Sequence, residues 1–543
     1  MKARQLPTNY LRLSFGKGCG ADRFEPGFYG LGENVNCEYG EAQPGPREVV
    51  DVTGIAAGYR VKAMCWHAGG LFIATDNGTD TKIYRQETTW VLAATISAAT
   101  VAGPYALVSF NSVLAVALGT GDAYQFSTNT GAVGAGYTFT ASTKSTASSK
   151  YANCFLVQSN GLVTPRVVYA TSPNELYFTT DLTNGDATGS TATYITDANS
   201  TDNYVTSLRE EDTGQLLIGM RRALWSLDGD LVRPQRLTHD FPDPPGDAGG
   251  QSDRNNFEAS CEVNGRVYYI VSGSELIEYD HGRINEFMAP KWQGPRIPRM
   301  GLPLNAICAV GGKVYLAMGT GNTLLGVAHA AGGTARTVAN IPGTTSDLYV
   351  GQYVEDPDDG SRRFTWHGVI LKCASLLRFM WFDEDTDYLY LCSGASEAIN
   401  LQQYRCIVTK DNGLYHLKSS VIVLNTGTWK LEVLGIDYGL PYYAKKAMHI
   451  ACRTIGLAST TPSLEVEYKV TGDYDATAFK SDFVTFIVNN RAELGENFPA
   501  NTIFHTMDLR FVGIGGTNVY AVLQEAELLA EDSEIQATAR VMR

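Results

Sequence analysis

The chain has 543 residues, of which 44% are apolar and 18% charged, and its 57 acidic residues outnumber its 43 basic ones. These proportions exclude a disordered chain, and the formal charge of −14 argues against a grip on nucleic acid through its phosphates. The 55 glycines and 29 tyrosines, with Thr and Val between the turns, indicate an all-β protein of two or three domains.

The first 55 residues stand apart from the rest of the chain. Glycine and proline recur across residues 16–46 at a density that prevents regular elements, with aromatic residues such as Phe24 between them. We therefore expect residues 1–55 to form an extended arm that packs on a neighbouring subunit. Residues 47–55, REVVDVTGI, have the pattern of a strand at the end of this arm that closes the repeat that follows.

From residue 56 to residue 425, the sequence pattern of one apolar hairpin is repeated about seven times. Its clearest copy is residues 311–327, GGKVYLAMGTGNTLLGV, in which each apolar strand follows a glycine turn. The first apolar residues of the copies, spaced by 43 to 53 residues except for 75 between the last two, are Leu71, Leu114, Val167, Leu216, Val267, Val314 and Leu389. A second short strand is expected after each of them, at Ile83, Tyr124, Leu176, Leu224, Leu276, Leu324 and Ile399.

Repeated hairpins of this length predict a β-propeller over residues 56–425. Each hairpin can bury its faces only against its neighbours, and units of about 40 to 50 residues have the period of four-stranded propeller blades. We expect seven blades, with six to eight allowed, because the interval of 75 residues leaves room for an eighth. The alternative is a large β-sandwich whose hairpins merely look alike.

Residues 426–543 have a different pattern. Within them, residues 464–470, LEVEYKV, alternate apolar and charged side chains, as expected for a strand with one buried face. We predict a separate β-sandwich that has its own core and folds when it is expressed alone. The clearest candidates for helices in the whole chain are residues 493–496 and 523–532, and both patterns are weak.

In this layout the chain resembles the virion structural proteins of tailed bacteriophages that join a β-propeller to a C-terminal sandwich. The residues that carry the resemblance are the turn Gly439-Leu440-Pro441, Lys446 at the entry to a strand, residues 464–470 closed by Gly472, MDLRF at 507–511, and the Gly- and Pro-rich arm. The resemblance implies a non-enzymatic structural part of the tail, in the nozzle, tip or baseplate, that acts through subunit assembly. It brings no catalytic motif, so no functional residue is carried over.

The resemblance also implies partners and a location. We expect a homo-oligomer in contact with other tail proteins in the virion, assembled in the host bacterial cytoplasm, with DNA passing nearby but not bound specifically, and with contact to the host surface left open. We expect no membrane insertion or secretion, because residues 1–13 lack the apolar run of a signal peptide and no stretch approaches about 18 apolar residues. Cysteines in apolar strands, such as Cys261, Cys308 and Cys392, predict reduced and buried thiols.

Motifs for catalysis or cofactor binding are not found in the sequence. The eight histidines form no HExxH motif, and there is no GxSxG elbow or phosphate loop, so we predict no catalytic, cofactor-binding or metal-binding residues and no cofactor. Acidic residues cluster at 355–360 and 383–387, where solvated turns are favoured and a cation site is left open. Five tryptophans suit core packing better than sugar stacking: Trp66, Trp90, Trp292, Trp366 and Trp381. Two alternative functions remain, a propeller glycosidase or lyase with acids at the channel mouth, and a module that binds host glycan.

Overall fold

The described part of the chain is built from β-strands. The computed structural model describes residues 9–532 except 14, 20–27, 38–39, 46–48, 51–52, 78, 98–105, 119–123, 134–135, 143–151, 172–174, 185–192, 195–204, 229–233, 243–255, 287–303, 320–326, 330–335, 339–345, 356–359, 361, 374–376, 386–387, 395–400, 412–413, 418–427, 439–443, 458–461, 471–478, 487–493, 500–501 and 516–520. The described strands are accompanied by one short 3-10 helix, Leu182–Asn184. The predicted all-β class is confirmed.

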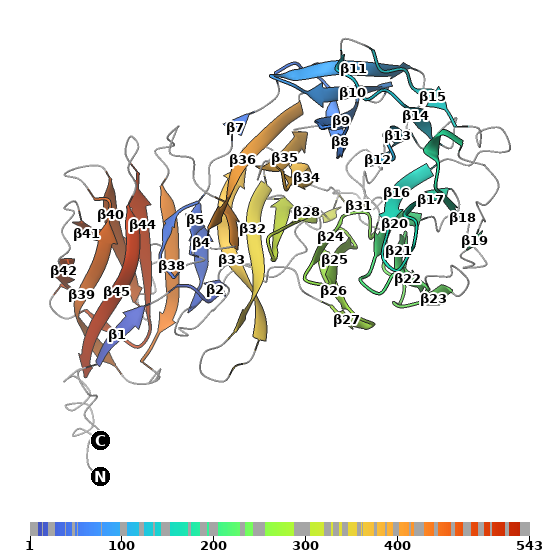
Figure 1. The fold of residues 1–543 in the computed structure, drawn as a ribbon. Coiled ribbons are helices and arrows are strands. Elements are labelled where there is room, and N and C mark those ends of the chain that lie inside the picture. Colours follow the sequence, from blue (N-terminus) through green and yellow to red (C-terminus); the bar gives the residue numbers. More distant parts are fainter. Residues whose placement is uncertain are drawn as a thin grey trace.

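The described strands form seven antiparallel blades of four strands each, arranged in a ring (Figure 1). Blade one contains β8 (Arg60–His67), β9 (Gly70–Asp76), β10 (Asp80–Gln86) and β11 (Trp90–Ser97). Blade two contains β12 (Ala106–Phe110), β13 (Val113–Ala117), β14 (Gln125–Ser127) and β15 (Thr140–Ala141). Blade three contains β16 (Ala152–Gln158), β17 (Arg166–Thr171), β18 (Glu175–Thr179) and β19 (Thr193–Tyr194). Blades four and five are β20 (Val205–Glu210), β21 (Leu216–Met220), β22 (Leu224–Leu227) and β23 (Pro234–Arg236); and β24 (Ser260–Val263), β25 (Arg266–Val271), β26 (Glu275–Asp280) and β27 (Arg283–Asn285). Blades six and seven are β28 (Leu304–Val310), β29 (Lys313–Gly319), β32 (Ser346–Glu355) and β33 (Arg362–Cys373); and β34 (Leu377–Asp383), β35 (Tyr388–Gly394), β36 (Leu401–Asp411) and β37 (Leu414–Leu417). The predicted propeller is confirmed, and each of the seven first apolar residues of the repeat lies buried in the second strand of a blade.

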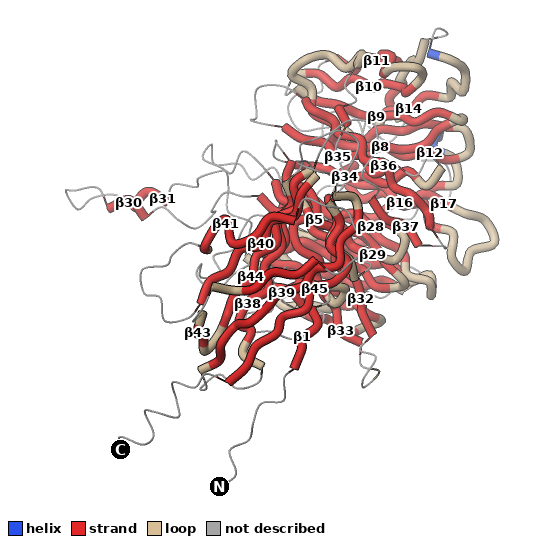
Figure 2. The backbone as a smooth tube through the Cα atoms, turned by 90° about the vertical axis from the view of Figure 1, so that its left-hand side faces the viewer, coloured by secondary structure: helices blue, strands red, loops and turns tan. Residues whose placement is uncertain are grey.

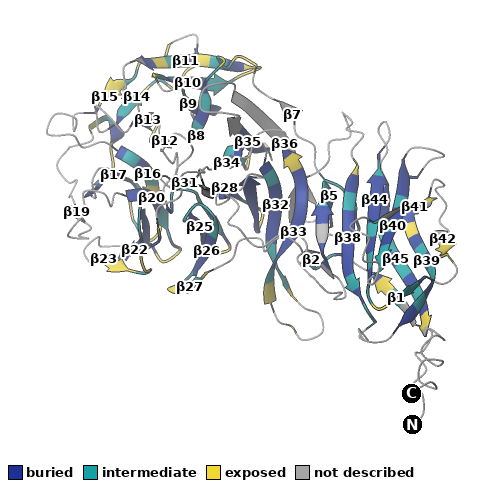
Figure 3. Ribbon diagram, turned by 180° about the vertical axis from the view of Figure 1, so that it is seen from behind, coloured by how far each residue is buried: buried dark blue, intermediate teal, exposed yellow. Residues whose placement is uncertain are grey.

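Neighbouring blades share buried apolar side chains across every seam of the ring. In β13, Leu114 and Val116 pack toward blade one, whereas Ala115 and Ala117 pack toward blade three. Both faces of such a strand are covered, which explains why the second strands have unbroken apolar sequences. Among the described residues, one buried cluster joins each adjacent pair of blades, including blades seven and one. The outermost strands, such as β15 and β23, are the exposed ones (Figure 3).

The long interval between Val314 and Leu389 is filled by an insertion in blade six. The described residues of this interval form no eighth blade. They form the short hairpin of β30 (Val327–His329) and β31 (Arg336–Val338), which projects from the molecule (Figure 2), and the long strands β32 and β33. The second strands expected at Leu324 and Ile399 lie outside the described residues. In blades six and seven the third strands are instead β32 and β36.

The ring is closed by packing and by a strand from the N-terminal part. β7 (Val49–Val50) pairs with β36 of blade seven, at the position expected for the closing strand over residues 47–55. The chain then reaches blade one, where the backbone N–H of Trp90 donates to the carbonyl of Thr53 over 2.9 Å. The N-terminal part therefore bridges the last blade and the first.

Two further sheets follow the propeller and share one core. One contains β1 (Asn9–Leu13), β45 (Val522–Asp532), β39 (Lys445–Ile455), β42 (Leu494–Asn497) and β43 (Ile503–Phe504), and the other contains β4 (Leu31–Glu33), β38 (Trp429–Ile436), β44 (Met507–Ile514), β40 (Ser463–Val470) and β41 (Lys480–Phe486). The short strands β2 (Gly18–Cys19), β3 (Phe28–Tyr29), β5 (Val35–Asn36) and β6 (Gln43–Pro44) lie beside them. We call these two sheets the two-sheet region.

The N-terminal arm belongs to the core of the two-sheet region. Leu13, Phe15, Tyr29 and Val35 are fully buried there together with residues such as Trp429. The expected boundaries at residues 55 and 426 therefore do not separate the arm from the predicted sandwich, because both contribute to one core. The described part of the arm packs within its own chain, and its expected contact with a neighbouring subunit stays a prediction.

The strand β4 joins the propeller to the two-sheet region. It pairs in parallel with β33 of blade six through Glu33 and Val369, and in antiparallel fashion with β38 through Glu33 and Lys430. One hydrogen-bonded sheet consequently runs from β28 at the channel through β4 to β41 at the far edge (Figure 1). The N-terminal arm is the element that makes this sheet continuous.

Both segments proposed as helices are strands. Residues 494–497 form β42, and residues 522–532 form β45, which lies between β1 and β39. In β45, Ala526, Leu528 and Ala530 are buried at every second position, so the pattern has the period of a half-buried strand. Pairing on both edges overrides the helix preference of the Glu-, Leu- and Ala-rich sequence.

Candidate functional site in the central channel

The innermost strands of the blades line a channel that contains two cavities of about 620 Å³ and 440 Å³. The larger cavity faces blades one to four, with Asn153, Phe155 and Leu156 in its wall, whereas the smaller one faces blades five to seven, with Glu262 and Arg378 in its wall. Cavities of this size match the range that small-molecule sites usually occupy. The channel is therefore the candidate site of the propeller.

Six residues line both cavities and define what we call the channel waist: Lys62, Arg209, Glu258, Ser260, Phe379 and Trp381. They come from blades one, four and seven and from the residues that lead into and begin blade five. The waist thus brings together two cations, one carboxylate, one hydroxyl group and two aromatic rings from distant parts of the sequence. Residues of these types can hold a polar ligand that also has an apolar face.

The seam between blades four and five is the loosest part of the channel wall. β20 and β24 make less contact than any other neighbouring pair of innermost strands. The Nε of Arg209 donates to the Oγ of Ser260 over 3.0 Å, and the hydroxyl of Thr206 donates to the carbonyl of Asn256 over 2.7 Å. Side-chain hydrogen bonds therefore supplement the buried apolar cluster in this seam, and two of their partners belong to the channel waist.

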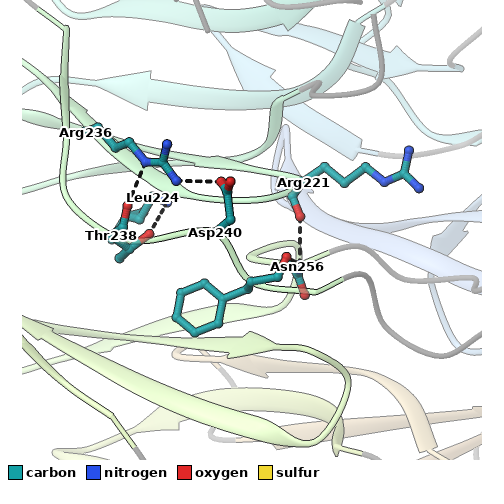
Figure 4. Close-up of polar contacts among 7 residues, drawn as sticks. Arg221, Leu224, Arg236, Thr238, Asp240 and Asn256 are labelled. Carbon is teal, nitrogen blue, oxygen red and sulfur yellow. Dashed lines mark hydrogen bonds and ion pairs between the residues drawn. The ribbon is translucent and has the colours of Figure 1, made fainter. Parts of the chain in front are cut away.

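Asn256 also stabilises the connection between blades four and five, through hydrogen bonds of its side chain (Figure 4). Its side chain is fully buried, and its Nδ2 donates to the carbonyl of Arg221 over 2.7 Å and to that of Pro242 over 3.0 Å. Its Oδ1 accepts from the backbone N–H of Ser272 over 2.6 Å. Asn256 ends a segment rich in Gly, Pro and Asp, and no local sequence pattern indicates this role, because its partners lie up to 35 residues away.

The electrostatic environment of the smaller cavity favours neutral groups. Burial raises the pKa of the Glu262 carboxyl, and the nearby Arg209 opposes that shift. Burial also raises the pKa of the Cys308 thiol to about 12, so this thiol stays protonated at neutral pH. None of the eight cysteines whose side chains are described forms a disulfide, and all of them but Cys65 are buried, as predicted for thiols used as small apolar residues.

In the described parts of the two acidic clusters, at 355–360 and 383–387, carboxylates contact other side chains of the protein. Asp383 is fully buried and accepts a hydrogen bond from the Nε1 of Trp66 over 2.7 Å, so it is not the solvated residue expected. Glu355 lies 3.8 Å from Arg362 as an exposed ion pair. Residues 356–359 and 386–387 of these clusters lie outside the described residues. Across the described part of the chain, no group of three or more His, Cys, Asp or Glu side chains has the spacing of a metal site.

Most of the tryptophans for which core packing was predicted do pack between blades. Trp66 and Trp90 lie in the seam between blades seven and one, and Trp366 lies in the seam between blades five and six. Trp381 differs because it lines both channel cavities in addition to packing on that first seam. Trp292 lies outside the described residues.

A third cavity, of about 710 Å³, lies between the turns of blades five and six. Its charged groups form pairs, with Arg266 at 3.1 Å from Asp280. Two tyrosines in its wall, Tyr268 and Tyr353, donate to the buried carboxylate of Glu278 over 2.6 Å and 2.7 Å. These bonds connect β25 and β26 of blade five to β32 of blade six, so the groups stabilise a seam.

Comparison with known proteins finds likeness only among solved structures. No family model matches the chain, and no curated protein matches it. A chain in the crystal structure of the mitotic checkpoint complex is 11% identical with a TM-score of 0.40, and covers 67% of this chain and 95% of its own length. YCF48 bound to D1 peptide is 12% identical with a TM-score of 0.40 over 67% and 97% of the two chains. The β-propeller domain of Cps50 (Swd1) from Myceliophteria thermophila is 9% identical with a TM-score of 0.36 over 65% and 98% of the two chains.

No helix of the described residues is long and apolar enough to cross a membrane.

Proposed function

We propose that this chain is a non-enzymatic structural component of a tailed-bacteriophage virion, in the tail nozzle, tail tip or baseplate, and that it acts by assembling with other subunits. The observation that supports this most is the sheet that runs without interruption from blade six through β4 into the two-sheet region. Domains of one chain usually move against each other unless a large interface holds them. A continuous sheet instead makes the propeller and the two-sheet region one stiff unit, which suits a part that carries load in a particle.

Glycines let the arm lie close enough to form this sheet. A Cβ atom on Gly368 of β33 would lie 2.9 Å from the Cα of Gly32 in β4, a distance that real Cβ atoms do not tolerate. A Cβ atom on Gly45 would lie 1.7 Å from the carbonyl oxygen of Ile370. The backbone N–H of Gly368 also donates to the phenol oxygen of Tyr29 over 2.9 Å. The junction therefore depends on the absence of side chains on both strands.

Imaging of the purified chain tests the proposal. We expect the full chain to form closed oligomers of one size, which mass photometry and cryo-electron microscopy can count. The variant Gly368→Val should lose these oligomers while keeping the circular dichroism of the propeller, because it separates β33 from β4. Arg362→Ala, on an exposed position of the same strand, is the matched control and should assemble normally. A full-length chain that stays monomeric at every concentration would argue against the proposal.

A glycan-directed function is the second candidate, and one observation favours it. Glu258, Glu262 and Trp381 line the same channel cavity. Most glycosidases use a pair of carboxylates, and an aromatic ring gives an enzyme or a binding module a surface on which a sugar can pack. Release of reducing ends from host polysaccharide would identify an enzyme. Binding without release would identify a binding module.

A further inference from the structure

We propose that the channel waist binds an acidic saccharide, with Lys62 and Arg209 taking up its carboxylate and Trp381 packing against a sugar ring. Two cations and one carboxylate belong to the waist, in a chain whose formal charge is −14. This local excess of positive charge favours a carboxylate ligand over a cationic one. The inference does not depend on where the chain is located or on whether it assembles.

Arg209 is prepared for such a ligand by its neighbours. Its Nε donates to Ser260 over 3.0 Å, and a second bond from its Nη2 to the carbonyl of the same residue fixes the plane of the guanidinium group. A guanidinium group held in this way loses little freedom when it binds a carboxylate. Lys62 comes from blade one, on the opposite side of the ring, so the two cations approach a ligand in the channel from different directions.

The other groups of the waist match the rest of a sugar. Trp381 and Phe379 are partly buried and line both cavities, and the apolar face of a pyranose ring packs on flat aromatic surfaces. Glu258 and Ser260, with Asn153 in the larger cavity, supply acceptors and donors for hydroxyl groups. Apolar surface on one side and a few polar groups on the other is the usual composition of a ligand site.

The charges of the two cavities also predict the direction of the ligand. Glu258 is the one carboxylate among the residues that line the larger cavity, whereas Glu262 and Glu384 join it in the wall of the smaller one. The larger cavity has two cations, Lys62 and Arg209, against this one carboxylate, whereas Arg378 brings the smaller cavity to three cations against three carboxylates. A negatively charged sugar is therefore favoured in the larger cavity. We therefore place the acidic sugar toward blades one to four and the uncharged end of the saccharide toward blades five to seven.

Titration calorimetry on the full chain tests this site with three probes: tri-galacturonic acid, neutral galactotriose and citrate. We expect the acidic trisaccharide to bind at least about tenfold more tightly than either other probe, because it alone offers the waist both a carboxylate and a sugar ring. Lys62→Met and Trp381→Leu should each weaken its binding by about tenfold or more on the same basis. Lys446→Met is the control and should leave binding unchanged, because Lys446 is a half-buried lysine of β39 that pairs with Glu531, outside the channel.

Three results would overturn the proposal. The first is no heat of binding with the acidic trisaccharide at millimolar concentration. The second is equal affinity for citrate, which would mean an anion site without any role for a sugar ring. The third is unchanged affinity in a Lys62→Met variant that melts at the temperature of the unmodified chain. Because oligomers are counted separately, failure here leaves the proposed structural role standing.

Discussion

The Nε1 of Trp66 donates a hydrogen bond of 2.7 Å to the Oδ1 of Asp383, and these two residues are 317 positions apart in the chain. They lie on β8 of blade one and β34 of blade seven, so their bond crosses the seam at which the ring closes. Asp383 also accepts from the backbone N–H of Asp385 over 3.1 Å. A buried carboxylate thus links the end of the propeller to its beginning.

Removing the indole donor should weaken the closure of the ring. Trp66→Phe leaves the buried carboxylate of Asp383 with one bond fewer, and we expect a loss of about 1–3 kcal/mol in the free energy of unfolding. Urea denaturation followed by fluorescence measures this loss. Asp385→Asn, at an exposed neighbouring position, should change stability by less than about 0.5 kcal/mol. Equal effects of the two substitutions would show that the bond does not contribute.

Asp347 should make the stability of the junction depend on pH. Burial raises its pKa to about 6 from 3.8, Lys372 on the paired strand opposes that shift, and Glu33 of β4 adds to it. Between these two pH values the folded state binds the proton more tightly than the unfolded state, so stability falls as the pH rises toward 6 and stays low above it.

Replacing Asp347 by asparagine removes this dependence. We expect Asp347→Asn to be more stable than the unmodified chain at pH 7.5, by about 1–3 kcal/mol from a shift of two pKa units. The two proteins should converge near pH 4. Denaturation at both pH values measures the difference, with Glu355→Gln at the exposed end of the same strand as a control. A stabilisation that is identical at pH 4 and pH 7.5 would contradict the assignment.

The two-sheet region should not fold without the arm. Residues 426–543 alone lack Leu13, Phe15, Tyr29 and Val35, which are buried in the shared core, and burying one such side chain contributes about 1.5–3 kcal/mol. We therefore expect this fragment to melt without a cooperative transition, in contrast to what the sequence suggested. The same fragment fused to residues 9–45 should melt cooperatively. A sharp transition in fragment 426–543 by itself would show that the arm is dispensable.

Arg510 should be a sensitive position in the two-sheet region. Its Nε donates to Glu432 over 2.7 Å and its Nη1 donates to Glu467 over 2.9 Å, so it neutralises carboxylates from the strands on both sides of β44. Arg510→Ala leaves the buried Glu432 without its cation, and we expect a loss of about 3 kcal/mol in stability. Arg510→Lys should recover part of that loss, since a lysine keeps the charge but not the forked geometry. Equal losses for both variants would mean that charge is unimportant here.

The chain should not bind duplex DNA at physiological salt. Neutralising phosphate charge and releasing its counterions requires lysine or arginine, and acidic residues outnumber basic ones by 57 to 43. Fluorescence anisotropy with a labelled duplex at 150 mM salt measures this directly. Binding that weakens steeply as salt is added would reveal a basic surface that the composition does not suggest.

The repeat could be predicted because its information is local. Each blade has a buried second strand such as residues 113–117, and the apolar run and the turn before it are visible within about ten residues. The third strand of blade six could not be predicted, because the insertion that contains β30 and β31 separates it from the second strand by more residues than in the other blades. Residues 522–532 were misjudged because their strand character depends on pairing with β1 and β39.

The docking of the arm and the channel waist could not be predicted in the same way. Arg12 pairs with Glu525 and Tyr29 binds Gly368, and no pattern in one sequence connects residues so far apart. Lys62 and Arg209 likewise follow no motif in their own strands, and Trp381 was expected to pack in the core. They become a candidate site only when the ring places the innermost strands around one channel.

The central claim, that this chain is a structural subunit of a phage tail, is tested most directly by cryo-electron microscopy of the particle that carries it. We predict a symmetric set of copies in the tail, each with a seven-bladed ring joined rigidly to the two-sheet region through β4. Full-length monomers that are absent from the particle and that cleave a polysaccharide would contradict the claim.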